Sequence, residues 1–161
     1  MKIFGLALDE QSQVPLLILK DKEEKQVLPI WIGAMEAMAI SISINKVSIS
    51  RPLTHDLMLQ AITTLGGTIE RVHIVDLREG TYYAEMHIGH KDQTFLMDSR
   101  PSDAIALAIR AEAPVFAAQS LLDRVAKQFD QDHEVVLKDE ESEQWTDFLE
   151  SYNIDDSKYP M

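Results

Sequence analysis

The chain has 161 residues, no cysteine and a formal net charge of −12 at pH 7. Its length predicts one domain that folds without a disulfide or a metal ion, and the lack of cysteine is typical of a reducing compartment. Because no apolar run approaches the roughly 20 residues of a membrane span, and the N-terminus turns acidic too soon for a signal peptide, we expect a cytoplasmic protein without a membrane partner.

The first part of the chain predicts three strands and then a buried helix. The strands are indicated by apolar segments that polar turns separate, at residues 1–9, 15–20 and 26–32. Gly33 ends the third strand. Residues 34–45 then predict a helix that is apolar nearly all round, which is typical of a helix buried in a core.

A second helix follows Arg51 and Pro52. Proline disfavours the helical region for the residue before it, so this helix begins after the pair. Thr54 is a natural N-cap, and apolar residues recur beyond it at helical spacing. Gly66 and Gly67 supply the stop signal.

The remainder of the domain predicts the same order of elements. Strands are indicated at residues 68–77, 81–88 and 93–98, with a hairpin turn between the first two. Two helices are indicated at residues 101–112 and 120–129, and a short apolar segment separates them.

The segments around Glu36 and Asp103 have similar sequences. In each, an apolar strand and a break precede the acid, and Ala-x-Ala with an aliphatic residue follows it. This pattern predicts a duplicated β-β-β-α-α unit, at about residues 1–67 and 68–134. We therefore expect an α+β fold of mixed or mainly antiparallel sheets packed with helices, in which the two acids converge on one polar cleft.

The negative charge is concentrated in the C-terminal part of the chain. Residues 1–130 form the predicted domain and are near neutral, whereas residues 131–161 predict an acidic linker and a C-terminal amphipathic helix. The apolar face of that helix, which would cover its own core or a partner subunit, consists of Trp145, Phe148, Leu149 and Tyr152. The domain can bind a phosphate locally, but it has no basic stripe to hold a long duplex.

An arginine and a proline precede two of the predicted helices, at Arg51 and at Arg100. A helix N-terminus offers free backbone N–H groups and partial positive charge, and an arginine fork beside it suits a phosphate. The alternative is ordinary capping, in which Asp56 and Asp103 complement the helix dipole and form salt bridges with the arginines. Because capping acids are common at helix starts, capping is the simpler interpretation of the sequence alone.

His55 is the candidate acid or base. It stands in the first turn of its helix, where we expect it to be partly exposed, and histidine titrates near neutral pH. The positive end of the helix favours the neutral, proton-accepting ring. The alternative is a surface imidazole that pairs with Asp56.

Glu36 interrupts an otherwise apolar helix, so its carboxylate needs a partner. Arg51 or Arg100 would provide one, in a structural ion pair that fixes how the two halves pack. Alternatively, Glu36 joins Asp98 and Asp103 in a carboxylate cluster for Mg²⁺ or Mn²⁺, ions that prefer oxygen ligands. The chain has no Gly-rich phosphate loop, and we expect no organic cofactor.

Three stretches together resemble the bifunctional nuclease domain family of bacteria and plants, which is credited with RNase and DNase activity. They are Val-Leu-Pro-Ile-Trp-Ile-Gly at residues 27–33 with Glu36 and Ala37, Arg-Pro-Leu-Thr-His-Asp-Leu at 51–57, and Arg-Pro-Ser-Asp-Ala-Ile-Ala-Leu-Ala at 100–108. The resemblance covers about residues 1–130. It implies an α+β hydrolase that cleaves phosphodiester bonds in RNA or DNA, as a homodimer or higher homo-oligomer.

The resemblance marks seven motif positions, which are Glu36, Arg51, His55, Asp56, Arg100, Ser102 and Asp103. In the nuclease hypothesis the two arginines and the serine bind the substrate phosphate, and His55 is the general acid or base. The three carboxylates are also catalytic and hold a Mg²⁺ or Mn²⁺ ion that activates water. The alternative is a non-catalytic anion-binding or regulatory homo-oligomeric module that uses the same cleft.

Overall fold

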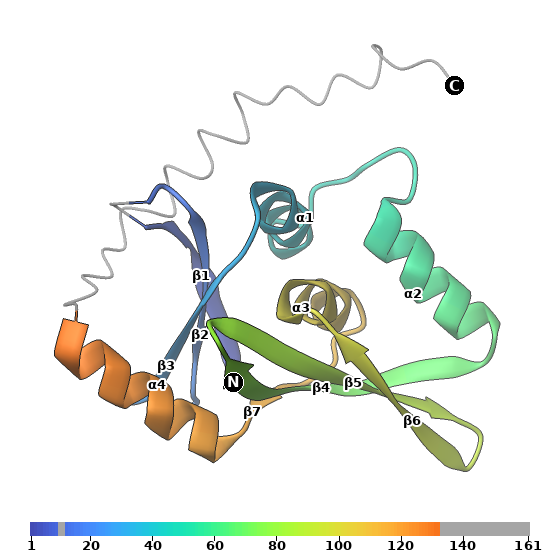
Figure 1. The fold of residues 1–161 in the computed structure, drawn as a ribbon. Helices are drawn as coiled ribbons and strands as arrows, with labels where there is room; N and C mark the ends of the chain where they lie inside the picture. Colours follow the sequence, from blue (N-terminus) through green and yellow to red (C-terminus); the bar gives the residue numbers. More distant parts are fainter. Residues whose placement is uncertain (10–11, 133–161) are drawn as a thin grey trace.

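The computed structural model describes residues 1–9 and 12–132, which form two sheets and their covering helices around a shared hydrophobic core (Figure 1). Among the helices of these residues, none is long and apolar enough to cross a membrane. Of the predicted acidic linker and C-terminal helix at residues 131–161, all but the first two residues lie outside the described part of the chain.

The first sheet is an antiparallel meander of β1 (Lys2–Leu8), β2 (Pro15–Lys20) and β3 (Val27–Trp31), in that order. β2 is the central strand, and its apolar residues are buried on both faces. The three predicted strands are confirmed, and their bounds agree with the prediction to within one residue at each end. Continuous burial of β2 explains why its sequence is apolar at successive positions rather than at alternate ones.

The second sheet begins as a similar meander of β4 (Gly67–Arg78), β5 (Thr81–His90) and β6 (Gln93–Ser99). A short strand, β7 (Val115–Ala117), joins it parallel to β4, so the order is β6-β5-β4-β7. The predicted α+β class with mixed and antiparallel sheets is therefore confirmed. Each half starts with a three-stranded meander and a helix, but β7 has no counterpart in the first half, and the duplication stays a prediction.

Two central helices, α1 (Ala34–Ile44) and α3 (Pro101–Arg110), join the sheets (Figure 1). α1 lies against β2, α3 lies against β4 and β5, and the two helices lie against each other. Residues 104–108 of α3 are all buried, as expected of a helix with neighbours on every side. α4 (Gln119–Asp132) contacts β3 and β4 and extends two residues past the predicted domain boundary.

α2 (Thr54–Thr64) lies against α3 and β4, but none of its residues is buried. The predicted N-cap at Thr54 is wrong by one residue, because the cap is Leu53 and the helix begins at Thr54. The carboxylate of Asp56 accepts the backbone N–H of Leu53 at 2.9 Å. That bond satisfies a backbone donor at the helix start, which the threonine hydroxyl was expected to do.

Replacing a buried side chain of α3 tests its place in the core. Ile105 is 0% exposed, whereas Ile44 at the end of α1 is 40% exposed. We expect Ile105→Ala to lower the free energy of unfolding by about 2–5 kcal/mol, because it removes buried carbon and leaves a cavity. Ile44→Ala, the matched control, should cost less than half as much. Urea denaturation followed by circular dichroism measures both, and equal losses would contradict this placement of α3.

Candidate functional site

Arg100, the N-cap of α3, links two carboxylates. Its Nε donates to Oδ2 of Asp103 at 2.7 Å, and its Nη2 donates to Oδ1 of the same residue at 3.2 Å. Its Nη1 donates to Oε1 of Glu36 at 2.9 Å. Glu36 lies in the first turn of α1 and Asp103 in the first turn of α3, so one guanidinium joins the two helix starts. The acids of the repeated pattern thus converge, and the partner of Glu36 is Arg100.

Gly33 leaves room for the Glu36 carboxylate. A Cβ atom at residue 33 would stand 2.2 Å from Oε2 of Glu36, far closer than two such atoms approach. Any larger residue there would push the carboxylate away from the start of its own helix. The glycine that is the N-cap of α1 therefore also allows Glu36 to fold back toward Arg100.

His55 from α2 completes the group. Its Nε2 lies 3.2 Å from Oδ1 of Asp103, and its side chain is 13% exposed. Partial burial raises the pKa of Asp103, but the hydrogen bonds from Arg100 and His55 outweigh it, so that pKa lies below its usual value. An ionised carboxylate only accepts, so Nε2 carries the proton of this bond, and Nδ1 is the ring atom that can accept a further proton. We call Glu36, His55, Arg100 and Asp103 the arginine cluster.

Asp56 belongs to a different pair. Nε of Arg110 donates to its Oδ1 at 2.5 Å, and the Arg110 side chain is only 7% exposed. The two Nη atoms of Arg110 donate to the backbone carbonyls of Ala106 and Ala39, which ties α3 to α1. Burial raises the pKa of Asp56. The hydrogen bonds from Arg110 and from the Leu53 N–H lower it by a larger amount, so the pKa lies below its usual value.

The three carboxylates predicted as metal ligands do not meet. Within residues 1–9 and 12–132, no three His, Asp or Glu side chains lie close enough together to hold an ion. Asp56 is paired with Arg110, and an ion between Glu36 and Asp103 would have to displace Arg100, which contacts both. The donor set in this arrangement fits a guanidinium rather than Mg²⁺ or Mn²⁺.

Two further predicted residues stand apart from the arginine cluster. Ser102 is buried in the first turn of α3, so its hydroxyl is poorly placed to reach a polymeric substrate. Arg51 is exposed in the loop before α2 and lines a separate pocket. Apart from Ser102, the motif positions thus divide between a cluster around Asp103 and a pocket beside Asp56.

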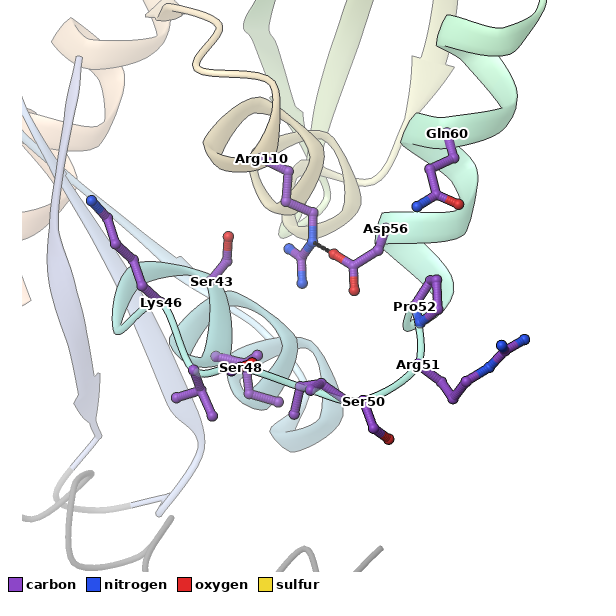
Figure 2. A pocket seen from close by; sticks show the side chains of 12 residues that line it. Ser43, Lys46, Ser48, Ser50, Arg51, Pro52, Asp56, Gln60 and Arg110 are labelled. Atoms are coloured by element: carbon purple, nitrogen blue, oxygen red, sulfur yellow. Dashed lines mark hydrogen bonds and ion pairs between the residues drawn. The ribbon is translucent and has the colours of Figure 1, made fainter. Parts of the chain in front are cut away.

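The pocket has a volume of about 530 Å³ and is formed by the end of α1, the loop to α2, the first turns of α2 and Arg110. Figure 2 shows Arg110 reaching from α3 to Asp56, while the side chain of Arg51 extends away from that pair. Lys46 also lines the pocket, so its lining contains three cationic side chains and one carboxylate, and serine hydroxyls add donors. Such a lining suits an anion. Because His55 and Asp56 are consecutive, the cluster and the pocket flank the same helix start.

Sequence reasoning missed Arg110. A signal was available, because it is the basic residue that follows an unbroken apolar run, residues 104–109, in its helix. A charged side chain at the end of such a helix needs a partner within reach. Its identity required the tertiary structure, since Asp56 lies on another helix.

Comparison with known proteins bears on this site. Residues 17–130 match the bifunctional nuclease domain. An uncharacterized protein of Mycobacterium tuberculosis is 33% identical over 98% of this chain and 97% of its own length. Bifunctional nuclease 2 of Oryza sativa subsp. japonica is 27% identical over 73% of this chain, and bifunctional nuclease 1 of Arabidopsis thaliana is 24% identical over 69%. The matched parts are 37% and 35% of those two plant proteins.

Asp56→Asn tests the pair with Arg110. We expect a loss of roughly 1.5–3 kcal/mol of unfolding free energy at pH 7, the range for hydrogen bonds to charged groups. Because the pKa of Asp56 lies below its usual 3.8, its contribution is present above pH 3.8 and is lost as the pH falls through the lowered pKa. The difference between wild type and variant should therefore shrink in acid.

Urea denaturation at pH 7 and at steps below pH 4 measures that difference. Glu79→Gln, at the exposed turn between β4 and β5, is the control and should change the stability by less than about 0.5 kcal/mol. A constant difference between wild type and Asp56→Asn across the pH range would contradict the ion pair.

Proposed function

Because the chain belongs to the bifunctional nuclease domain family, we propose that it hydrolyses phosphodiester bonds in RNA, DNA or both. The observation that carries this proposal is a pair of hydrogen bonds that share one carboxylate, since Asp103 contacts both His55 and Arg100. It combines a proton-transfer group with a phosphate-binding group on neighbouring helix starts, which is the minimum that phosphodiester cleavage needs.

Arg100 would bind the scissile phosphate. Its guanidinium has five N–H donors, of which the hydrogen bonds to Glu36 and Asp103 use three. The side chain is mostly exposed, so the remaining donors can reach the non-bridging oxygens of a phosphate. These donors would stabilise the charge that develops on those oxygens as the nucleophile attacks.

His55 would transfer the proton. The lone pair on Nδ1 accepts a proton from the attacking water, and the water oxygen forms a bond to phosphorus. The bond from phosphorus to the leaving oxygen breaks, and that oxygen takes a proton from the imidazolium. Asp103, held ionised by Arg100, orients the ring through Nε2 and stabilises its charged form.

The pocket beside Asp56 would hold the next part of the substrate. Its cationic lining lies on the other side of the α2 start, and Arg51 provides a flexible contact for a neighbouring phosphate. The whole chain carries a net charge of −12, which opposes binding along a long duplex. We therefore propose a short or single-stranded nucleic acid as the substrate.

Metal dependence stays a prediction. In the arrangement above, Mg²⁺ or Mn²⁺ would compete with Arg100 for Glu36 and Asp103, so no step is assigned to an ion. The cytoplasmic location inferred from the sequence is likewise a prediction.

A second candidate function is an anion-binding module without catalysis. It is favoured by the pairing of each acid of the site with an arginine, which is also what a structural ion-pair network looks like. In that case the pocket would take a small anion, and the arginine cluster would fix the position of α2. Loss of cleavage on removal of a proton-transfer group separates the two candidates.

His55→Ala should lower kcat for a labelled single-stranded oligonucleotide by roughly 10²- to 10⁴-fold, the usual contribution of a general acid or base. Asp103→Asn should also lower kcat, because it removes the charge that orients the ring. The matched control is His73→Ala on β4, which should leave kcat unchanged.

The assay uses RNA and DNA versions of one oligonucleotide in Mg²⁺, Mn²⁺ or EDTA, so that a need for an ion shows in the wild type. Cleavage that persists undiminished in both site variants would contradict the proposed roles. Wild-type protein that binds the oligonucleotide without cleaving it in any of these buffers would favour the anion-binding module.

A further inference from the structure

The pocket beside Asp56 holds more positive charge than its own contacts neutralise. Lys46 and Arg51 line it, and within residues 1–9 and 12–132 neither forms an ion pair. The ionised carboxylate of Asp56 balances only Arg110. Two positive charges therefore remain, in a chain whose net charge is −12. A local surplus of this sign attracts an anion to the pocket.

Arg110 adds unused hydrogen-bond donors to this charge. Its guanidinium has five N–H groups, and three of them are bonded, to Asp56 and to the carbonyls of Ala106 and Ala39. Figure 2 shows the guanidinium between Ser43 of α1 and Asp56 of α2, on the lining of the pocket. The side chain is only 7% exposed. Because a buried donor without an acceptor is costly, the two remaining N–H groups favour an acceptor in the pocket.

The two features that would repel an anion are already compensated. The oxygens of Asp56 accept hydrogen bonds from Arg110 and from the Leu53 N–H. α1 ends beside the pocket, and the carbonyls at the end of a helix carry partial negative charge. Three carbonyls of its last turn, those of Ser41, Ile42 and Ser43, accept the backbone N–H groups of Asn45, Val47 and Lys46.

The lining distinguishes a sugar and its phosphate from a base. Among the described residues that line the pocket none is aromatic, whereas sites for unpaired bases commonly stack them on aromatic rings. The hydroxyls of Ser43 and Ser48 and the amide of Gln60 offer hydrogen bonds to sugar and phosphate oxygens instead. The volume of about 530 Å³ is that of a site for an organic ligand, so it has room for more than a free phosphate ion.

Charge decides which phosphate fits. A phosphodiester inside a strand carries one negative charge, whereas a phosphate monoester at its end carries about 1.5 to 2 at neutral pH. The surplus of two positive charges matches the monoester. We propose that the pocket binds the terminal phosphate of a single-stranded oligonucleotide, with Lys46 and Arg110 donating to its oxygens. The inference rests on the proposed nuclease function and names the class of substrate, a strand with a phosphorylated end.

α3 sets the distance from the bound end to the arginine cluster. Asp103 and Arg110 are seven residues apart on this helix, which is about 10 Å at 1.5 Å per residue. Stacked nucleotides of one strand are about 3.4 Å apart. A strand whose terminal phosphate lies at Arg110 therefore reaches Asp103 after about three nucleotides. Cleavage should fall within about three linkages of the phosphorylated end.

Binding tests the pocket apart from cleavage. The protein is the full chain with His55→Ala, and the probes are one internally labelled oligonucleotide with a 5′-phosphate, with a 3′-phosphate or with hydroxyls at both ends. A hydroxyl-ended strand that is one nucleotide longer controls for added charge. By fluorescence anisotropy we expect one of the two end phosphates to tighten binding roughly 10- to 100-fold, the effect of one or two charge-assisted contacts. Equal affinity for all four probes would overturn the proposal.

Two lysines in the same backbone conformation provide a matched pair of variants. Lys46 in the pocket has a φ of 51°, and Lys91 in the turn between β5 and β6 has a φ of 54°. Glycine adopts this conformation without strain, so Lys46→Gly and Lys91→Gly remove one charge each and leave the backbone relaxed. Made in the His55→Ala protein, Lys46→Gly should lower the end preference about 10-fold, and Lys91→Gly should leave it unchanged. A preference that survives Lys46→Gly, or that falls equally in both, would contradict the pocket.

The products of the wild type separate this inference from the nuclease proposal. On the preferred end-phosphorylated strand, a sequencing gel should show cuts within about three linkages of that end. Cuts spread evenly along the strand would overturn the inference and leave the nuclease proposal standing. An end preference in a wild-type protein that cleaves no strand would support the pocket and contradict the nuclease proposal.

Discussion

The contact between α1 and α3 positions the rest of the molecule. Each helix contacts the other more extensively than it contacts any other element, and each lies against a different sheet. Ala37 of α1 and Ala104 of α3 are fully buried directly after Glu36 and Asp103. Small side chains allow two helices to approach closely. The repeated pattern of an acid followed by alanines therefore has two effects, since it permits the packing and brings the acids together at the helix starts.

Two carboxylates brought together in this way would repel each other. Arg100 offsets that repulsion, because it bonds to both and its own pKa is raised, chiefly by Asp103. The ion pairs are partly exposed, so they contribute little to global stability, which depends mainly on the buried core. Their role in this account is geometric. They keep Asp103 ionised and oriented toward His55, and this orientation defines the proton on Nε2.

α2 is the element that most depends on polar contacts. None of its residues is buried. Its start is nevertheless held to α3 by the hydrogen bond between His55 and Asp103 and by the ion pair between Asp56 and Arg110. Asp103 and Arg110 are seven residues apart, close to two helical turns, so both anchors lie on one face of α3. These anchors place the histidine within the arginine cluster on one side and form a wall of the pocket on the other.

Apart from β7, which the sequence indicated only as a short apolar segment, the strands and helices of the described residues could be predicted from the sequence, because apolar spacing and the breaks at Gly33 and Pro52 are local signals. The convergence of Glu36 and Asp103 was also predictable, since the repeat relates their surroundings. The partner of Asp56 was not, because Arg110 is 54 positions away and only the packing of α2 on α3 joins them. The direction of the Arg51 side chain was not predictable either, because Arg51 lies in a loop. Helical spacing in α2 predicted a helix but could not show that Leu57 and Met58 would stay exposed.

Chemical rescue tests most directly the central claim that His55 transfers the proton in an arginine cluster built for phosphodiester cleavage. The measurement is oligonucleotide cleavage by His55→Ala with increasing concentrations of imidazole, beside wild type and Asp103→Asn. We expect imidazole to restore cleavage to His55→Ala in proportion to its concentration and to leave Asp103→Asn unchanged. Cleavage by His55→Ala that equals the wild type without imidazole, or that imidazole does not restore, would contradict the account.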